Sequence, residues 1–265
     1  SREFNGAVFQ WAFSAMREAE LIQQISLNRN ILTDRIAMPV SAYNAELQKL
    51  CEHIFSENIS AWEKDPANLV PSIHHFIGAM HAPIVLLFDA MRYDLFCAIE
   101  PLFDKNGWKA KKTAFCLSPL PSDTLTFRAA LFPDIELANG LEFEHQGKRF
   151  IFLSAAERDY KRDELRSLLE SNPDATLLLS IGLLDEKIHG STLSAAAIAS
   201  ELILFCEQTL LPLLSAVSSS RDLVILNDHG FSENPQYAQK SEPRYSHGGN
   251  TFYERIVFAS HLVKK

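Results

Sequence analysis

The sequence predicts an α/β protein with a mainly parallel central sheet flanked by helices, preceded by a helical N-terminal lead-in. From Pro83 onward, short apolar runs alternate with stretches of helical periodicity, which is typical of strands joined by helical crossovers. Three of the runs, Pro83–Phe88, Ala175–Leu184 and Leu223–Leu226, are followed within two residues by an aspartate. The first 80 residues show helical spacing instead. These observations together indicate the fold class.

Length and composition fit a globular protein. The chain has 265 residues, of which 47% are apolar, and this is ample for a packed core in one large domain or two small ones. The formal net charge of −8 predicts no large basic face for duplex DNA or an anionic membrane. The four cysteines form no C-x-x-C pair, which argues against a zinc knuckle and a disulfide framework. No apolar run approaches the ~20 residues of a membrane span and no signal peptide is recognisable, so we expect a cytoplasmic protein with no membrane partner.

The lead-in has apolar residues at helical spacing in Phe4–Ile25, Ser41–Phe55 and Leu69–Met80. We therefore divide the chain into residues 1–81, a helical segment that packs on the core or on a neighbouring domain, and residues 82–265, the core. Four histidines in or next to the lead-in have no aspartate or cysteine at ligand spacing, so we do not expect them to bind metal.

The core is expected to contain six strands with helices on both faces of the sheet. The strand candidates are Ile84–Phe88, Trp108–Phe115, Arg149–Leu153, Thr176–Ile181, Leu223–Leu226 and Arg255–Ala259. The helical patterns are Arg92–Phe103, Asp123–Phe132, Asp159–Leu169 and Leu193–Ser215. One long polar segment, Ser232–Asn250, is predicted as a loop, and loops of this length in compact domains are more often functional than idle.

Aspartate and histidine gather where predicted strands end. Asp185 and His189 are four residues apart, so in a helical turn their side chains would share a face and suit one cation. Asp228 and His229 are adjacent and would both face one ion only if the strand has ended, which Gly230 permits. Open parallel sheets place their sites beyond the carboxyl ends of their strands. For Asp228 and His229 taken alone, a helix-capping aspartate followed by a polar loop histidine is an equal alternative.

Two further ligand candidates complete the set. Asp89 follows the first strand, and His247 precedes Gly248 and Gly249, where glycine would let the backbone approach a ligand closely. The set then contains three aspartates and three histidines. Two zinc-like or manganese-like ions would take such ligands and keep a position open for substrate.

A hydrolase with two metals also needs a nucleophile, and hydroxyl groups are present at a predicted loop-to-helix junction. Ser122, Thr124 and Thr126 lie in the segment Leu120–Thr126. Helix N-termini favour anions because their first N–H groups are unpaired and the dipole end is positive. The competing interpretation is an ordinary N-cap, formed by Ser122 or Asp123, of a helix that begins near Thr124.

The ordered set resembles the alkaline phosphatase superfamily in Asp89, Thr124, Asp185-x-x-x-His189, Asp228-His229-Gly230 and His247-Gly248-Gly249. More narrowly, four segments look like the PglZ domain, known from bacterial phage-defence systems and some response regulators. These segments are Phe88–Asp94, Leu120–Thr124, Asn227–Phe231 and Arg244–Gly249. The resemblance covers about Ala82 to Phe258 and leaves the lead-in unexplained.

The resemblance implies a metal-dependent phosphodiesterase or nuclease-like hydrolase with two divalent ions, zinc in the first place and manganese or magnesium as alternatives. One ion would be held by Asp89, Asp228 and His229, with Thr124 as a further ligand and the nucleophile. The other would be held by Asp185, His189 and His247. The implied substrates are nucleotide or nucleic-acid phosphodiesters, and the implied partners are other defence or signalling proteins.

Two arginines are weighed separately as substrate-binding residues. Arg92 and Arg244 lie close in sequence to proposed ligands, and either would suit bidentate binding of a phosphate. Structural pairing with Asp94 or Glu242 is an equal alternative.

Two other functions stay open. The first is a non-catalytic PglZ module that keeps its ligands for stability and docks other proteins in a defence complex. The second is another hydrolase of the superfamily, such as a phosphomonoesterase, a sulfatase or a mutase, although no phosphosugar clamp is recognisable for a mutase.

Overall fold

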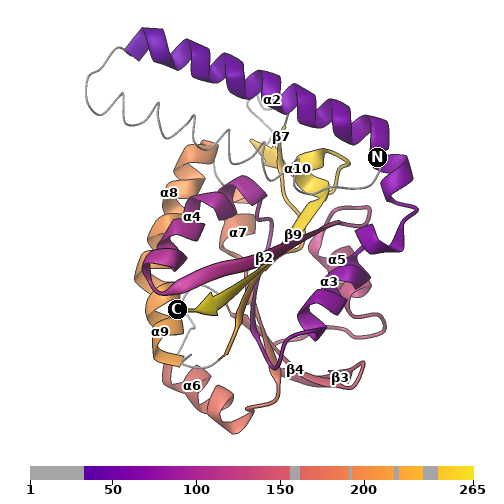
Figure 1. The fold of residues 1–265 in the computed structure, drawn as a ribbon, viewed down its shortest axis with the longest axis vertical. Helices are drawn as coiled ribbons and strands as arrows, with labels where there is room; N and C mark the ends of the chain where they lie inside the picture. Colours follow the sequence, from indigo (N-terminus) through magenta and orange to yellow (C-terminus); the bar gives the residue numbers. More distant parts are fainter. Residues whose placement is uncertain (1–32, 156–161, 191–192, 218–220, 235–243) are drawn as a thin grey trace.

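The computed structural model describes residues 33–155, 162–190, 193–217, 221–234 and 244–265. Within these ranges the chain forms a seven-stranded sheet flanked by helices and a separate two-stranded sheet (Figure 1). The strands of the large sheet are β1 (Ile84–Phe88), β2 (Trp108–Leu117), β3 (Leu141–His145), β4 (Lys148–Ala155), β5 (Thr176–Ile181), β6 (Leu223–Asn227) and β9 (Ile256–Lys264). The small sheet pairs β7 (Ser232–Glu233) with β8 (Tyr245–Ser246).

The helices account for most of the remaining described residues. They are α2 (Thr33–Trp62), α3 (Val70–Gly78), α4 (Tyr93–Lys105), α5 (Thr124–Leu131), α6 (Arg162–Ser171), α7 (Leu183–Gly190), α8 (Ala195–Phe205), α9 (Leu211–Val217) and α10 (Phe252–Arg255). A 3₁₀ turn, η1 (Pro66–Asn68), precedes α3, and a π-helical turn, η2 (Cys206–Leu210), joins α8 to α9. The predicted helix at Phe4–Ile25 lies outside the described residues.

The sheet is mixed, with the strand order β2-β9-β6-β1-β5-β4-β3. The four strands β6, β1, β5 and β4 run parallel, whereas β3, β9 and β2 each pair antiparallel with their neighbours. The predicted α/β class, with a central sheet flanked by helices, is confirmed, but the sheet has seven strands where six were predicted, and it is mixed and only partly parallel. An apolar run indicates burial but not strand direction, so β9 and β2 gave no sign of their orientation. The seventh strand, β3, was missed because it is a half-exposed edge strand.

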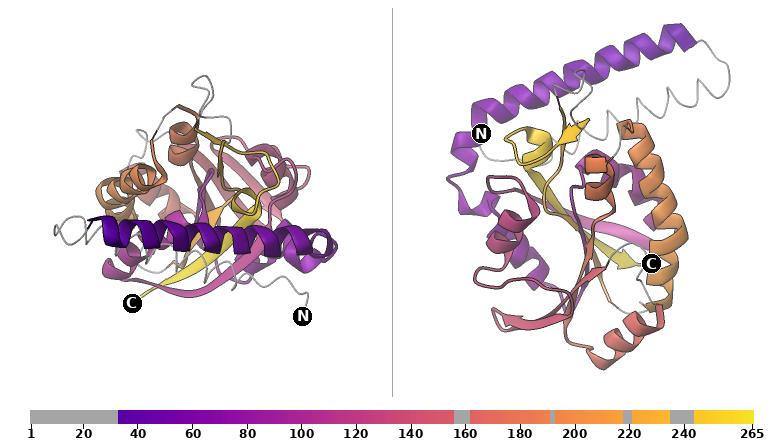
Figure 2. Two further views of the ribbon diagram at one scale, coloured as in Figure 1. Left: turned by 90° about the horizontal axis from the view of Figure 1, so that it is seen from above. Right: turned by 180° about the vertical axis from the view of Figure 1, so that it is seen from behind.

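Alternation along the strands divides the core between the two faces of the sheet. In β1, Ile84, Leu86 and Phe88 belong to one cluster of buried side chains, and Val85 and Leu87 belong to another. Helices α4, α6, α8 and α9 cover the first face, and α3 and α5 cover the second (Figures 1 and 2). Because helices cover both faces, the sheet offers chemistry only at its ends.

The run α8–η2–α9 corresponds to the single helix predicted at Leu193–Ser215. Its segment Ala197–Ser215 is long and apolar enough to cross a membrane by length and composition, so the expectation that no run approaches this length is wrong. Half of the segment is buried inside the protein, and the core helix of a soluble protein meets the same criterion. The cytoplasmic location stays a prediction.

Helix α2 crosses the end of the molecule at which β7 and α10 lie (Figures 1 and 2). Its buried side chains, among them Phe55 and Trp62, join the core cluster on the α4 face. The buried Arg255 side chain ties the segment after α2 to the core, since it donates to Glu63 Oε1 at 2.7 Å, Asn250 Oδ1 at 2.5 Å and the Ser118 carbonyl at 2.6 Å. The described part of the lead-in thus packs on the sheet domain, while a boundary at residue 81 stays a prediction.

Candidate metal centre

The three predicted aspartate ligands follow three adjacent strands of the sheet. Asp89 follows β1, Asp228 follows β6, and Asp185 lies in α7, which follows β5. Strand β1 pairs with both of the others, and its last residue, Phe88, is level with Ile181 and Asn227. The carboxyl ends of the three strands therefore meet at one edge, and the predicted convergence of these residues is found in the structure.

Asp89, Asp228 and His229 form what we call the buried group. Their ligand atoms all lie within 4.8 Å of one another. The Nε2 atom of His229 is 3.5 Å from Asp89 Oδ1 and 3.7 Å from Asp228 Oδ1. Two donor atoms about 2.1 Å from one tetrahedral ion lie about 3.4 Å apart, so this spacing suits a shared divalent cation.

Hydrogen bonds orient the buried group. His229 Nδ1 lies 2.9 Å from the Gly230 carbonyl, which can only accept, so Nδ1 is a donor and Nε2 is the ring nitrogen that faces the carboxylates, where it can carry a proton or bind an ion. Asp228 Oδ1 accepts from the backbone N–H of Ala90 at 3.1 Å and of His229 at 2.7 Å. The other oxygen, Asp228 Oδ2, is buried and has no hydrogen-bond partner among the described residues. A cation at this position would satisfy that oxygen, so the residues present fit a bound metal ion.

Burial also sets the electrostatics of this group. Removal from water raises the pKa of the Asp228 carboxyl, against the opposing effect of the His229 charge. The same burial would lower the pKa of His229, but the Asp228 and Asp89 carboxylates outweigh it and the net pKa is raised. Both shifts show that the group favours an added positive charge, which a proton or a divalent ion supplies.

Asp185, His189 and His247 form what we call the exposed group. Asp185 Oδ1 is 3.1 Å from His189 Nε2 and 3.3 Å from His247 Nε2, and the two nitrogens are 2.8 Å apart. Two imidazole nitrogens at this distance need a proton or a cation between them, because two lone pairs would repel. A hydrogen bond from His247, together with the nearby histidine charges, holds the pKa of Asp185 below its usual range despite partial burial. The short distance between Asp185 and His189 in α7 confirms the prediction that this i, i+4 pair shares one face of a helix.

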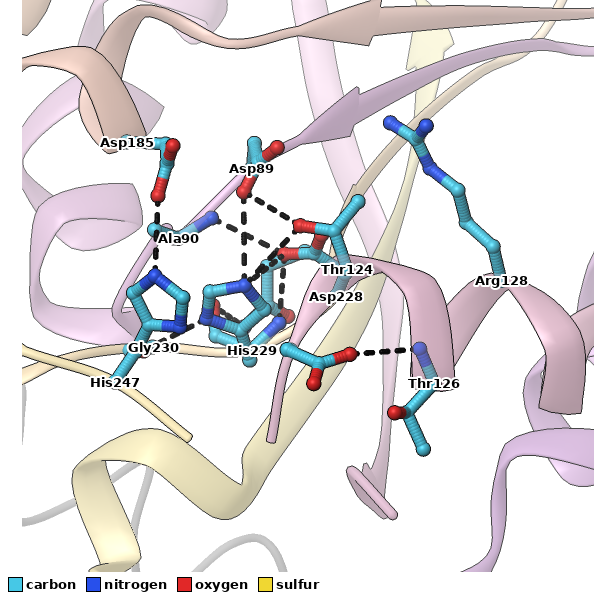
Figure 3. A network of polar contacts seen from close by, with 12 residues as sticks. Asp89, Ala90, Thr124, Thr126, Arg128, Asp185, Asp228, His229, Gly230 and His247 are labelled. Carbon is cyan, nitrogen blue, oxygen red and sulfur yellow. Dashed lines mark hydrogen bonds and ion pairs between the residues drawn. The ribbon is translucent and has the colours of Figure 1, made fainter. Parts of the chain in front are cut away.

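The two groups are neighbours, since the rings of His229 and His247 are 4.6 Å apart between centroids. Two-metal hydrolytic sites hold their ions about 3.5–4 Å apart. Figure 3 shows Asp185 and His247 of the exposed group beside the buried group, with Thr124 next to Asp89 and His229. The arrangement suits two ions acting on one substrate.

Among the candidate hydroxyls, only that of Thr124 contacts the cluster in the described contacts. Its Oγ1 donates to Asp89 Oδ1 at 2.9 Å and lies 3.3 Å from His229 Nε2. The Thr126 side chain points away from the cluster (Figure 3). The N-cap interpretation is also correct for Asp123, whose carboxylate accepts from Thr126 N at 2.7 Å and starts α5.

Ser122 is fully buried and links two loops of the site. Its hydroxyl donates to the Gly249 carbonyl at 2.8 Å, and its own carbonyl accepts from Gly248 N at 3.1 Å. Gly249 leaves room for a neighbour, since a Cβ there would lie 2.6 Å from Glu254 Oε2. The structure thus gives Gly249 a packing role, where close approach to a ligand was expected.

The two predicted phosphate-binding arginines are engaged in structural contacts. Arg92 donates to both carboxylate oxygens of Asp94, at 2.9 and 2.5 Å, and its guanidinium lies 4.1 Å from the Tyr253 ring centroid. Arg244 donates to Glu233 at 3.2 Å, while Glu242 lies outside the described residues. A role of either arginine in substrate binding stays a prediction.

Sequence reasoning missed Arg128, which lies one turn after Thr124 in α5 (Figure 3). The signal was present, because residues four apart in a predicted helix share a face.

A scan against protein-family models and a search of curated proteins find no match for this chain. The resemblance to the PglZ domain therefore rests on the residues and their order, and the function is argued from the geometry of the site.

Proposed function

We propose that this chain is a metal-dependent phosphoric ester hydrolase of PglZ type, a phosphodiesterase or nuclease-like member of the alkaline phosphatase superfamily. We further propose that it acts with other proteins of a bacterial phage-defence or signalling system. The observation that supports this most is the Thr124 hydroxyl, which contacts the buried group while the exposed group lies next to it. A structural N-cap would not need this contact with two ligand residues.

In this proposal, Asp89, Asp228 and His229 hold one divalent ion, and Asp185, His189 and His247 hold the other. Zinc suits this mixture of carboxylate and imidazole, with manganese or magnesium as alternatives. When bound, the ions supply positive charge that stabilises the negative charge developing on the phosphoryl oxygens. The protein holds the ligand atoms together before the ions arrive, and this lowers the cost of ordering the site.

The proposed nucleophile is Thr124 Oγ1. Its proton is directed to Asp89 Oδ1 at 2.9 Å, which fixes the hydroxyl rotamer and leaves its lone pairs free. By the resemblance, this oxygen forms a bond to phosphorus while the bond to the leaving ester oxygen breaks. Water then hydrolyses the threonine–phosphate ester, which releases the phosphate product and restores the threonine hydroxyl. A substrate with large substituents has room on the side of the exposed group, where 52% of the His189 side chain is accessible to solvent. This favours diesters and polymer ends.

The first test is a metal analysis of the purified protein, combined with turnover of bis-p-nitrophenyl phosphate in added zinc or manganese. We expect Thr124→Ala to keep both ions and lose at least about 10³-fold in activity, because only the nucleophile is removed. Thr126→Ala is the matched control, since it removes the same hydroxyl from the same helix where that group points away from the site. Ser122→Ala should keep most of the activity when zinc is in excess, because its hydroxyl does not contact the cluster.

The outcomes separate the three functions. Suppose that the metal-loaded protein hydrolyses neither diesters nor single-stranded DNA, and that Thr124→Ala binds partner proteins as wild type does. The non-catalytic module would then be the better explanation than the enzyme. A preference for p-nitrophenyl phosphate or a sulfate ester over the diester would indicate another hydrolase of the superfamily.

A further inference from the structure

Helix α5 carries a second polar residue on the face that bears Thr124. Thr124, Phe127, Arg128 and Leu131 lie at helical spacing, and Phe127 and Leu131 are fully buried against the sheet. The stripe that they define therefore faces the sheet, and Arg128 follows Thr124 by one turn along it. An arginine on the inward face of a helix needs a reason, because arginine is almost never buried without a partner.

The guanidinium of Arg128 reaches the strand next to Asp89. Its Nη2 donates to Ser180 Oγ at 2.9 Å, and its carbon lies 5.2 Å from the centroid of the Phe152 ring. Ser180 of β5 is level with Leu87 of β1, and the backbone N–H of Asp89 donates to the next β5 residue. Because Leu87 and Asp89 are two residues apart, they point to the same face of the sheet as Ser180. Arg128 and Asp89 thus reach the same end of the same face.

Arg128 has no acidic partner within the part of the chain that the structure describes. No carboxylate of a described residue forms an ion pair with it, and its Nε is buried without a hydrogen-bond partner. Arg92 and Arg255 differ from it, since Arg92 pairs with Asp94 and Arg255 pairs with Glu63. A partly buried positive charge with an unpaired N–H donor reduces the stability of the protein unless an anion binds to it and accepts that hydrogen bond.

We propose that Arg128 binds the non-bridging oxygens of the phosphoryl group that Thr124 attacks. This inference rests on the proposed function and adds to it a substrate-binding residue. A guanidinium presents several N–H donors in a plane that matches the oxygens of a phosphate, and such charge-assisted pairs are short and strong. The Phe152 ring and the Ser180 hydroxyl hold the guanidinium in place. A phosphate between Thr124 and Arg128 would provide the anion that Arg128 lacks.

The test compares four zinc-loaded proteins: wild type, Arg128→Gln, Arg128→Lys and Arg149→Gln. Arg149→Gln is the matched control, because it removes the same charge from an exposed ion pair with Glu142 on the β3–β4 hairpin. Calorimetry measures the affinity of each protein for inorganic phosphate. Steady-state kinetics with bis-p-nitrophenyl phosphate give kcat and KM. Zinc content and Tm show whether each variant is folded and loaded. We expect Arg128→Gln to weaken phosphate binding about 10- to 100-fold, Arg128→Lys less, and Arg149→Gln less than about twofold.

The outcomes distinguish this inference from the proposed function. If wild type turns over the diester and Arg128→Gln retains the phosphate affinity and kcat/KM of wild type, only the role of Arg128 is refuted. If zinc-loaded wild type neither binds phosphate nor hydrolyses the diester, the proposed function fails and this inference fails with it. If Arg128→Gln loses zinc or does not fold, Arg128→Lys and Ser180→Ala decide instead. Unchanged phosphate affinity in both of these variants would refute the role.

Discussion

The buried group and the exposed group contain the same kinds of ligand on different supports. Asp228 and His229 follow a central strand and their side chains are 0% exposed, whereas the His189 side chain is 52% exposed. In the buried group, backbone and carbonyl contacts fix both residues. In the exposed group, one histidine lies on the short helix α7 and the other on the loop after β8. Both groups thus use carboxylate and imidazole, two and one in the buried group and one and two in the exposed group, but only the buried group is held by backbone contacts in the core.

Because of this difference, we expect metal affinity and protein stability to be coupled at the buried group more than at the exposed group. A preorganised group pays little ordering cost on binding, so it should hold its ion more tightly. It also brings carboxylates together in the core, and their repulsion destabilises the protein when no cation is bound. The exposed group is hydrated, so the loss of its ion should cost the fold much less.

The largest expected effect comes from Asp228→Asn. The amide oxygen keeps the acceptor for Ala90 N and His229 N, while the buried charge is removed. We expect the zinc-depleted variant to be at least as stable as zinc-depleted wild type. We expect it to lose the stabilisation that zinc gives this group, about 4 kcal/mol at a zinc concentration 1,000-fold above Kd. Denaturant titrations with chelator and with zinc would measure both. An equal gain from zinc in the variant and in wild type would contradict the role of the buried group.

The next effect is that of His189→Ala. Because this side chain is half exposed, the free energy of unfolding of the zinc-depleted protein should change by no more than about 0.5 kcal/mol. The zinc stoichiometry should fall from two to one, and the remaining ion should resist a competing chelator as it does in wild type. Loss of both ions in His189→Ala would show that the two groups do not bind independently and would remove the distinction drawn here.

The sequence was informative where the two groups depend on strand ends. A buried strand that ends in aspartate is visible as an apolar run, so Asp89, Asp185 and Asp228 were found and their convergence followed from the sheet. Strand order and direction depend on long-range packing, which no local pattern contains, and the mixed sheet was therefore missed. The contacts of Ser122, Arg92 and Arg128 were not predicted either. They depend on which segments pack together and on which rotamer each side chain adopts, and the sequence determines neither locally.

A smaller effect tests how the loop of His247 is held. Ser122→Ala removes the hydrogen bond that this fully buried hydroxyl donates to the Gly249 carbonyl. We expect a loss of about 1–2 kcal/mol in the free energy of unfolding and weaker binding of the ion of the exposed group, while the ion of the buried group is retained. Thr126→Ala, which breaks no such bond, is the control. If both variants bind two ions with wild-type affinity, the link between the loops does not position His247.

The smallest effect concerns a buried histidine that has no carboxylate beside it. His74 packs against the rings of Phe132, Phe150 and His145, and its Nε2 has no hydrogen-bond partner among the described residues. Burial lowers the pKa of His74 to about 4, and the charges of His145, His75 and Lys148 act in the same direction. This environment opposes a positive charge, whereas that of His229 favours one.

The sign of the resulting pH effect follows from proton uptake. In the unfolded chain the pKa of a histidine is about 6.5, so between that pH and about 4 the unfolded state binds more protons than the folded state. The contribution of His74 to stability is therefore complete above pH 6.5 and is lost as the pH falls toward 4. Between pH 7 and 5.5 we expect a loss of about 1 kcal/mol. Urea titrations of zinc-depleted wild type and His74→Leu over this range would isolate it, because the metal ligands titrate equally in both. Parallel pH profiles would show that protonation of His74 is not opposed by its surroundings.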